Sequence, residues 1–346
     1  MNKIIECVPN FSEGRNESII QAIAAAIRSV EGVKLLHIDS GKAANRTVMT
    51  FAGVPEAVVE AAFQGIKKAA ELIDMRLQTG EHPRIGATDV CPLIPISGVT
   101  MEETIEWSKK LAAKVGDPLS ILNENEGIPV FLYENSASKP ERQNLANIRG
   151  GEYESLKQKL TLPDWKSDFG PSVFNPRSGA TVIGARDFLI AYNVNLNTKD
   201  VNIAKKIAQT VRESGYLVTL PNGEKQRQAG LLKSVKAIGW FIEEFGCAQV
   251  SMNLTNIDVT SVYEAFETCS EIAQKYGAQV TGSELIGLMP KRVMMEAGLY
   301  FLQKKNQDVN VSERVILDAA VEGLGLSDLA FFNPKERIIE YLLEDV

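Results

Sequence analysis

Runs with the pattern of strands alternate along this sequence with runs that have helical spacing, and this alternation restricts the possible folds more than any other feature. Lys3–Pro9 and Ile128–Tyr133 are short apolar runs rich in β-branched or aromatic residues, as strands are. Between them, apolar residues repeat at helical spacing from Ile19 to Val30, and a further helical pattern begins at Pro55. A chain that alternates in this way is expected to fold as an α/β protein.

The alternation is interrupted once and then begins again. Asn135–Ser178 is polar and rich in proline and glycine, with one predicted helix near Tyr153–Leu160, and long connections of this kind are usually functional or link domains. Further strands and helices follow, including a predicted helix over Asp200–Arg212. We therefore expect the fold class α/β (α+β), with two α/β subdomains over residues 1–178 and 179–346, each a mixed sheet covered by helices and the second with a helical tail.

The charge of the chain argues against nucleic acid as a partner, because the formal net charge is −7. A net-negative protein can still bind an anion through a local group of arginine, lysine and backbone N–H groups. No apolar run approaches the ~20 residues needed to cross a bilayer, and the N-terminus lacks the apolar region of a signal peptide. We therefore expect a cytoplasmic protein that binds no membrane.

Cysteine and histidine are too few and too scattered to indicate a metal site. The four cysteines, Cys7, Cys91, Cys247 and Cys269, include no Cys-x-x-Cys pair, and the chain has two histidines. We interpret the cysteines as buried thiols and expect no metal.

Ionisable side chains gather in the segment Thr79–Pro95, TGEHPRIGATDVCPLIP, which shows little helix or strand character of its own. Glu81, His82, Arg84 and Asp89 lie within nine positions. The glycine and proline beside His82 place it on a loop, where a structural role and a catalytic role are both open. Glu81 and Asp89 could orient the imidazole, and Arg84 could hold an anion. The chain has no nucleophile motif, so general acid–base chemistry is favoured over covalent catalysis.

Several other residues have two interpretations. His37 and Asp39 face the same side of a predicted strand; we interpret His37 as structural and Asp39, at the strand's carboxyl end, as a functional candidate. Trp165 and Phe169 could stack on a flat ligand or attach their loop to the core. Pro9–Arg15 could form an anion-binding turn, although helix capping by Ser12 and Asn16 is favoured. No phosphate-binding or dinucleotide-binding glycine motif is present in the sequence.

Segments spread over the whole chain resemble, in order, the signature segments of one family, the glutamate formiminotransferases. They are VPNFSEGRN, HIDSGKAANRTVMTFAG, GEHPRIGATDVCPLIP, WKSDFGPS, GATVIGARDFLIAYNVNL, VKAIGWFIEE, AQVSMNLTN and FFNPKERIIEYL. The resemblance implies transfer of the formimino group from N-formimino-L-glutamate to N5 of tetrahydrofolate, in histidine degradation. It also implies two α/β subdomains with folate in a groove or tunnel between them, and a homodimer.

The resemblance also assigns roles to residues. The GEHPR motif makes His82 the catalytic residue. The segment similar to the family's folate-contacting stretch consists of Pro163, Asp164, Trp165, Lys166, Ser167, Asp168, Phe169, Gly170, Pro171 and Ser172.

Chemistry suggests partners for this centre. A carboxylate, Asp39 first and Glu81 second, is expected to steady the amidinium or orient the imidazole. Arg46 and Arg84 are the candidates for the substrate carboxylates, because the guanidinium fork matches a carboxylate. Asn10 joins them as a substrate-binding candidate.

Other functions remain open at this stage. The same site could transfer a formyl group between 5-formyltetrahydrofolate and glutamate, or close the ring of that folate. A non-catalytic folate-binding module is a further alternative. The chain resembles a transferase without a cyclodeaminase domain, so a separate cyclodeaminase is a possible partner.

Overall fold

The computed structural model describes residues 3–117 and 127–343. The chain divides into two compact units, Met1–Asp187 and Phe188–Glu344, and each unit combines a sheet with helices. The α/β fold class with two subdomains is therefore confirmed.

The first unit is built on a seven-stranded sheet. Its strands are β1 (Ile4–Cys7), β2 (Asn10–Phe11), β3 (Val33–Gly41), β4 (Arg46–Gly53), β5 (Thr88–Ser97), β6 (Val130–Glu134) and β7 (Thr181–Ala185). The order is β1-β4-β2-β5-β7-β6, with β3 paired to β4 and a further pairing between β1 and β5. The sheet is mixed, because β7 runs parallel to β5 and β6 while the other pairings are antiparallel.

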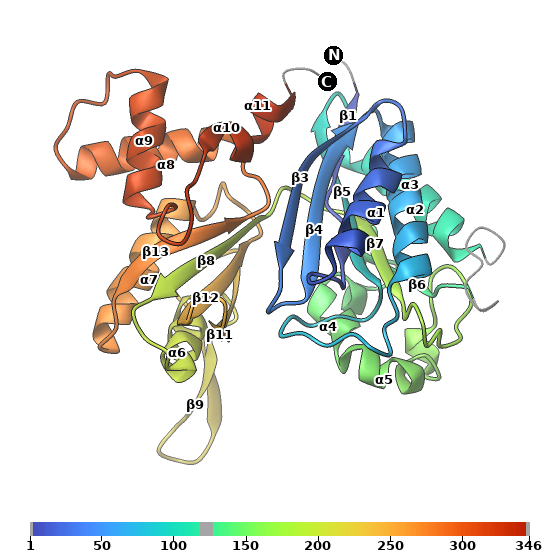
Figure 1. Ribbon diagram of the computed structural model, residues 1–346. Helices are drawn as coiled ribbons and strands as arrows, with labels where there is room; N and C mark the ends of the chain where they lie inside the picture. Colours follow the sequence, from blue (N-terminus) through green and yellow to red (C-terminus); the bar gives the residue numbers. More distant parts are fainter. Residues whose placement is uncertain (1–2, 118–126, 344–346) are drawn as a thin grey trace. The chain divides into compact units, whose positions relative to one another are not determined.

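Helices cover the first sheet on both faces (Figure 1). Its long helices, α1 (Glu17–Arg28), α2 (Pro55–Leu72) and α3 (Met101–Gly116), bury their apolar residues against one face. The short helices α4 (Leu145–Arg149) and α5 (Glu152–Lys159) belong to the connecting segment and cover β5, β6 and β7 on the other face. Single-turn 3₁₀ helices at Pro140–Arg142 and Pro163–Trp165 complete that segment.

Strand β5 corrects the expectation that Thr79–Pro95 has little regular structure. The strand begins at Thr88 and lies between β2 and β7, near the middle of the sheet. Its residues from Thr88 to Ile94 are buried, with helices on both faces. A strand buried on both faces has no alternation of apolar and polar residues, and this is why the sequence pattern does not indicate it.

The second unit contains an antiparallel sheet, with helices on one face. The strands β8 (Ile190–Leu196), β11 (Val235–Ile242), β12 (Cys247–Leu254) and β13 (Val280–Ile286) lie in the order β11-β12-β8-β13. Its pairings are antiparallel, unlike the mixed sheet of the first unit. The helices are α6 (Val201–Val211), α7 (Val262–Lys275), α8 (Lys291–Lys304), α9 (Glu313–Gly323), α10 (Pro334–Arg337) and α11 (Ile339–Leu343).

A separate hairpin lies between α6 and β11 in the second unit. Strands β9 (Tyr216–Thr219) and β10 (Lys225–Gln228) pair only with each other among the described strands. Most of their side chains are exposed.

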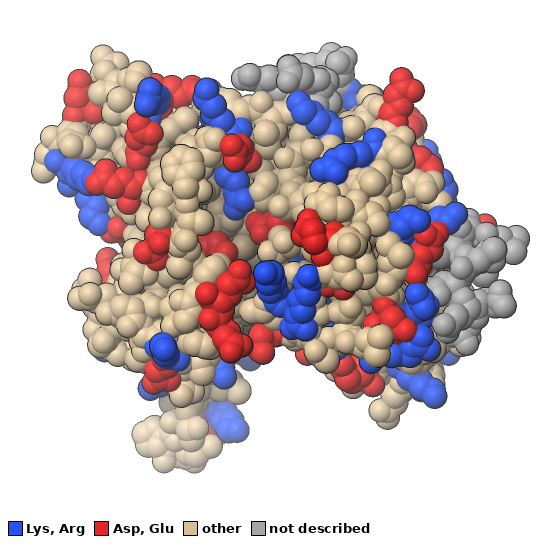
Figure 2. All heavy atoms as spheres, in the orientation of Figure 1, with Lys and Arg blue, Asp and Glu red and all other residues tan. Residues whose placement is uncertain are grey.

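The surface in Figure 2 carries acidic and basic side chains interspersed with one another. Within 3–117 and 127–343, no helix is long and apolar enough to traverse a bilayer. Cys7, Cys91 and Cys269 are buried thiols as expected, whereas Cys247 is only half-buried.

Candidate active site

The loop between α2 and β5 carries His82, and backbone contacts hold its two ends. Near its start, the Met75 N–H donates to the Arg177 carbonyl over 2.8 Å. Near its end, Gly86 approaches β7 so closely that a Cβ there would lie 2.1 Å from the Ala180 carbonyl oxygen. The Ser12 hydroxyl donates to the Gly86 carbonyl over 2.7 Å. The loop is therefore held in place at both of its ends.

Asp89, the second residue of β5, is the centre of a buried ion-pair cluster. Its carboxylate accepts from Arg46 Nη1 at 2.7 Å and from Arg149 Nη2, and the Ile85 N–H donates to Oδ1 over 3.0 Å. Burial alone would raise the pKa of Asp89, but the guanidinium groups of Arg149 and Arg46 hold it well below its usual range. The carboxylate is therefore charged throughout the physiological range.

Arg46 joins β4 to β2 and β5. Its Nε donates to the Asn10 Oδ1 over 2.9 Å while Nη1 is paired with Asp89. Burial lowers the pKa of Arg46 to about 10, against the opposing effect of Asp89. The two substrate-binding candidates Asn10 and Arg46 are thus in direct contact with each other.

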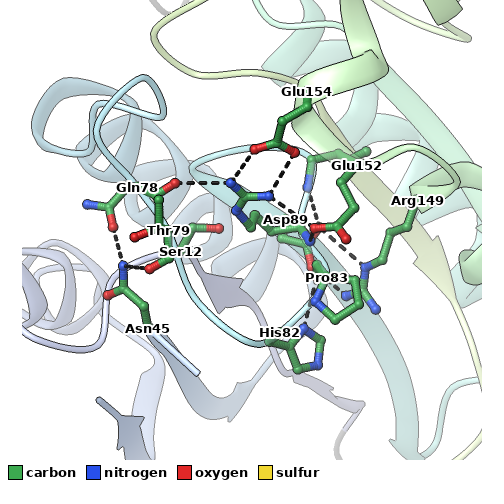
Figure 3. Close-up of polar contacts among 12 residues, drawn as sticks. Ser12, Asn45, Gln78, Thr79, His82, Pro83, Asp89, Arg149, Glu152 and Glu154 are labelled. Atoms are coloured by element: carbon green, nitrogen blue, oxygen red, sulfur yellow. Dashed lines mark hydrogen bonds and ion pairs between the residues drawn. The ribbon is translucent and has the colours of Figure 1, made fainter. Parts of the chain in front are cut away.

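His82 lies beside this cluster (Figure 3), and its ring nitrogens are distinguishable. Nδ1 lies 2.8 Å from the Pro83 carbonyl oxygen. Because a carbonyl oxygen can only accept, Nδ1 carries the hydrogen of the neutral ring, and the basic lone pair is on Nε2. Burial lowers the pKa of His82 well below its usual range, and the charges of Arg46 and Arg149 lower it further. The imidazole is therefore neutral near pH 7 and can accept a proton.

Arg84 belongs to a different contact group from His82. Its guanidinium binds both oxygens of Glu154 at 2.6 and 3.0 Å, contacts Glu152 at 3.0 Å, and donates to the Gln78 carbonyl. In Figure 3, Glu154 and the His82 ring lie on opposite sides of the group of residues that is drawn. Arg84 thus anchors helix α5 to the loop.

The two carboxylates expected near the imidazole lie on the His82 loop itself and on β3. Glu81 is exposed, and its N–H donates to the Ala43 carbonyl over 3.3 Å. Asp39 lies on β3, which pairs with β4, in register with Val48. The carboxylate whose charge acts on the pKa of His82 is Asp89.

The expected folate-contacting segment is fixed to β6 through Asp168. The carboxylate accepts from the Leu132 N–H at 2.7 Å and from the Ser138 hydroxyl, and pairs with Arg142 at 2.6 Å. Arg142 is 2% exposed and also donates to the carbonyl groups of Asp164 and Lys166. The segment therefore has a preset backbone.

Both aromatic residues of this segment pack on apolar residues of the first unit. Trp165 contacts Phe131 edge to face, with ring centroids 6.4 Å apart. Phe169 packs against the core under α1–α3, and its N–H and carbonyl both bond to Val130. Within the described part of the chain, they attach the segment to the core, which was one of the two interpretations. The rest of the segment forms a turn in which the Ser167 N–H and hydroxyl contact the Ser172 hydroxyl at 3.0 and 2.8 Å.

The turn before α1 is a helix entry. Asn16 caps the helix by accepting from the N–H groups of Ser18 and Ile19. Ser12 is not a cap, because its hydroxyl bonds to Gly86 instead. The N–H groups of Arg15 and Asn16 donate to the Glu13 carboxylate at 2.8 and 2.9 Å, so an acidic side chain of the turn occupies the place of an external anion.

Sequence reasoning missed Arg149. It lies on α4, 60 positions from Asp89, inside a segment that showed no sign of a helix there. No spacing in the sequence connects the two residues. Among residues 3–117 and 127–343, the structure shows no group of three or more histidine, cysteine, aspartate or glutamate side chains that could hold a metal ion.

Comparisons with known proteins agree with this fold. The family model for the formiminotransferase domain, N-terminal subdomain, matches residues 4–186, and that for the formiminotransferase domain matches residues 191–344. The chain is 44% identical over 308 residues to a glutamate formimidoyltransferase of Streptococcus pyogenes serotype M1, covering 89% of this chain and 96% of the relative. It is 42% identical over 320 residues to a glutamate formimidoyltransferase of Thermoplasma acidophilum, covering 92% and 98%.

A longer relative matches the whole chain. A formimidoyltransferase-cyclodeaminase of Dictyostelium discoideum is 46% identical over 346 residues, which cover all of this chain and 61% of the relative. The chain therefore spans about three fifths of that relative's length. The fold and site define a two-unit α/β protein with a histidine beside a buried carboxylate–arginine cluster. The chain belongs to the formiminotransferase domain family.

Proposed function

We propose that this protein is a glutamate formiminotransferase, which moves the formimino group of N-formimino-L-glutamate to N5 of tetrahydrofolate. The products are 5-formiminotetrahydrofolate and L-glutamate. The observation that carries the proposal is the neutral His82 imidazole with its basic nitrogen defined as Nε2. Family membership and the names of the bacterial and archaeal relatives support the same reaction.

One histidine can serve both halves of the reaction. N5 attacks the carbon of the protonated amidine, the C=N electron pair moves to the imino nitrogen, and His82 Nε2 takes the proton that N5 loses as the new C–N bond forms. The tetrahedral carbon then carries three nitrogens, which are N5, the former imino nitrogen and the nitrogen of glutamate, and glutamate leaves only if its own nitrogen is protonated. The imidazolium returns its proton to that nitrogen as the second C–N bond breaks, so His82 ends neutral. Such acid–base catalysis contributes about 10²–10⁴ in rate.

The neighbouring charges suit this cycle. The positive charges of Arg46 and Arg149 favour the neutral ring before reaction, while the fixed negative charge of Asp89 favours the imidazolium in mid-reaction. In this proposal Asp89 is a positioning residue, acting through the arginines. The binding of substrates side by side contributes further, because well-oriented pairs reach effective molarities of ~10⁵ M or more.

Further roles stay proposals. Arg46, Asn10 and Arg84 are the candidates for substrate carboxylates, and Asp39 and Glu81 for the amidinium. We propose Pro163–Ser172 as the folate-contacting segment, supported by the rigid turn around Ser167 and Ser172. We assign the two subdomains to residues 1–178 and 179–346. We also propose a cytoplasmic homodimer, whose product is consumed by a separate cyclodeaminase; light scattering during gel filtration tests the dimer.

The experiment is turnover with formiminoglutamate and tetrahydrofolate, in wild type and His82→Ala. Acid converts the product to the methenyl form, which is read by near-ultraviolet absorbance. We expect a loss of about 10²–10⁴ in turnover on removing the base. His37→Ala, the only other histidine variant the chain offers, is the matched control and is expected to retain turnover. Wild-type turnover in His82→Ala would contradict the mechanism.

The alternative donor is tested in the same assay. Formylglutamate with tetrahydrofolate, and 5-formyltetrahydrofolate with glutamate, replace the formimino substrates, and the turnover of each pair is compared. Higher turnover on the formyl substrates would assign the formyl transfer or ring-closing reaction instead. Folate binding without turnover on either donor would assign a binding module.

A further inference from the structure

The sheet of the second unit has one apolar face and one polar face. Alternate residues of β8 and β12, including Tyr192, Val194, Val250 and Met252, belong to the apolar core that contains residues of α6, α7 and α8. The intervening residues point to the other face and are polar. Among the described strands, Trp240, Gln249 and Asn195 form one row across β11, β12 and β8. Asn193 and Glu284 form the next row across β8 and β13.

The polar residues of these two rows form one hydrogen-bonded group, which we call the amide network: Asn193, Asn195, Trp240, Gln249 and Glu284. Trp240 Nε1 donates to Gln249 Oε1 over 3.1 Å, and Gln249 Nε2 donates to Asn195 Oδ1 over 2.8 Å. Asn193 Nδ2 donates to Glu284 Oε2 over 2.9 Å, and Gln249 Nε2 also lies 3.3 Å from this oxygen. Two amide groups therefore fix one carboxylate oxygen.

The burial of this group shows that it is more than a solvated sheet surface. Asn195 and Gln249 are 0% exposed and Asn193 is 4% exposed. Buried amides without partners are costly, but in a satisfied network they hold side chains in single orientations. A sheet that only needed packing could use apolar residues, as its other face does. Rigid, oriented polar groups are what a recognition site requires.

The acceptor chemistry of the network defines its ligand. Asn193 and Gln249 both donate to Glu284, whereas Asn195 Nδ2 donates to Asp328 Oδ2 over 3.1 Å. Two amide donors therefore make the Glu284 carboxylate a directed, negatively charged acceptor. A carboxylate binds best to a planar group with two parallel N–H donors on neighbouring nitrogens. We propose that Glu284, oriented by Asn193 and Gln249, recognises an N–C–N edge with two N–H donors.

This inference rests on the proposed function, since both of its substrates carry such an edge. One is the protonated amidine of formiminoglutamate, and the other is the 2-amino-4-oxopyrimidine ring of tetrahydrofolate. The formyl analogue of the first has an oxygen in place of one nitrogen. Glu284 thereby becomes a specificity-determining residue for one of the two substrates.

Two pairs of ligands, matched except for the edge, test the proposal by calorimetry without turnover. Pterin and lumazine differ in the 2-amino group, which is an oxygen in lumazine. Formiminoglutamate and formylglutamate differ in the same way. We expect the wild-type protein to prefer the N–H-bearing member of one pair by about tenfold to a hundredfold, which is what hydrogen bonds to a charged group contribute. The discriminated pair identifies the substrate.

Variants connect the preference to the residue. Glu284→Gln keeps the shape but replaces one acceptor with a donor, and it is expected to abolish the discrimination. Glu243→Gln removes one charge from the exposed turn between β11 and β12 and is the matched control. Glu284→Asp keeps the charge but shortens the side chain by one methylene. It is measured in place of Glu284→Gln if the glutamine variant does not fold, and it is also expected to lose the discrimination.

The outcomes separate this inference from the proposed function. Discrimination lost in Glu284→Gln supports the inference, even if the wild type shows no transferase turnover. Equal binding of both members of both pairs by the wild type overturns it, even if turnover is normal. Discrimination that persists in folded Glu284→Gln or Glu284→Asp also overturns it.

Discussion

The Arg46 Nη1 lies 2.7 Å from the Asp89 Oδ2, and both side chains are buried, at 7% and 0% exposure. This pair joins two strands of the first sheet, and Arg149 adds helix α4 to the same carboxylate. One negative charge therefore faces two positive charges close to His82, which leaves one net positive charge there. The balance determines both the stability of the site and the proton affinity of the imidazole.

Asp89→Asn is expected to destabilise the fold strongly. Removing one partner leaves the arginines as uncompensated buried charges, which costs about 3–5 kcal/mol. Urea unfolding measures this loss. The control is Asp318→Asn, which breaks a 3.8 Å surface pair with Arg314 at a residue 70% exposed, and should cost less than about 1 kcal/mol. Similar losses of unfolding free energy in both variants would show that the buried cluster stabilises the fold no more than the surface pair does.

The rate of the proposed reaction should persist on the acid side of pH 7. Only the neutral His82 ring can accept the N5 proton, and its pKa lies well below 6.5 because of burial and the two arginines. The acid limb of kcat/KM against pH, which reports groups of the free enzyme, is therefore expected to have its midpoint below 6.5. A midpoint at or above 6.5 would contradict a base with a lowered pKa.

Arg149→Gln should move that acid limb to higher pH. The positive charge of Arg149 lowers the pKa of His82, so its removal makes the imidazolium easier to form. The pH profile of kcat/KM gives the shift directly. Arg76→Gln, which loses a half-exposed pair with Asp74, is the control and should leave the limb in place. An unchanged or lowered midpoint in Arg149→Gln would show that Arg149 does not lower the pKa of His82.

Local signals in the sequence predicted local structure well. The helical spacing from Ile19 to Val30 is confirmed as α1, and the helical pattern that begins at Pro55 is confirmed as α2. These features depend on residues three or four positions apart, whose chemistry is readable in the sequence. The α/β class follows from many such signals together.

Contacts between distant segments could not be predicted in the same way. Asp89 and Arg149 meet although 60 positions separate them. The guanidinium of Arg84 is bonded to Glu152 and Glu154, about 70 positions away, and no spacing in the sequence indicates these partners. A charged residue has the same appearance in the sequence whether it binds a ligand or a distant side chain. Only the fold shows which partner is present.

Glu6→Gln should stabilise the protein at high pH. Glu6 is 2% exposed on β1, and burial raises its pKa from 4.5 to about 7, against the opposing charge of Arg186. Between these values the native state keeps a proton that the unfolded state has released, so the stability of the wild type falls as pH rises. The shift corresponds to about 3 kcal/mol.

The measurement is the difference in unfolding free energy between Glu6→Gln and wild type, from pH 5 to pH 8. The glutamine cannot ionise, so the difference should grow in favour of the variant as pH rises. Glu31→Gln, at an exposed position, should show a difference that does not vary with pH. A constant difference for Glu6→Gln as well would show that Glu6 has no raised pKa.

Gly170→Ala tests whether the turn at Pro163–Ser172 depends on a close backbone approach. Gly170 has φ +73°, and a Cβ there would lie 2.3 Å from the Ile128 carbonyl oxygen. Gly223 has φ +83°, and a Cβ there would have nothing within 4 Å, so Gly223→Ala contains the backbone strain without the clash. That strain costs about 1–2 kcal/mol, and a clash in a packed region adds about 1–3 kcal/mol.

Urea unfolding should therefore show a larger loss of unfolding free energy for Gly170→Ala, and calorimetry should show weaker binding of 5-formyltetrahydrofolate in this variant alone. Equal stability losses would contradict the close approach, whereas unchanged folate binding in a folded Gly170→Ala protein would remove the turn from the proposed folate site.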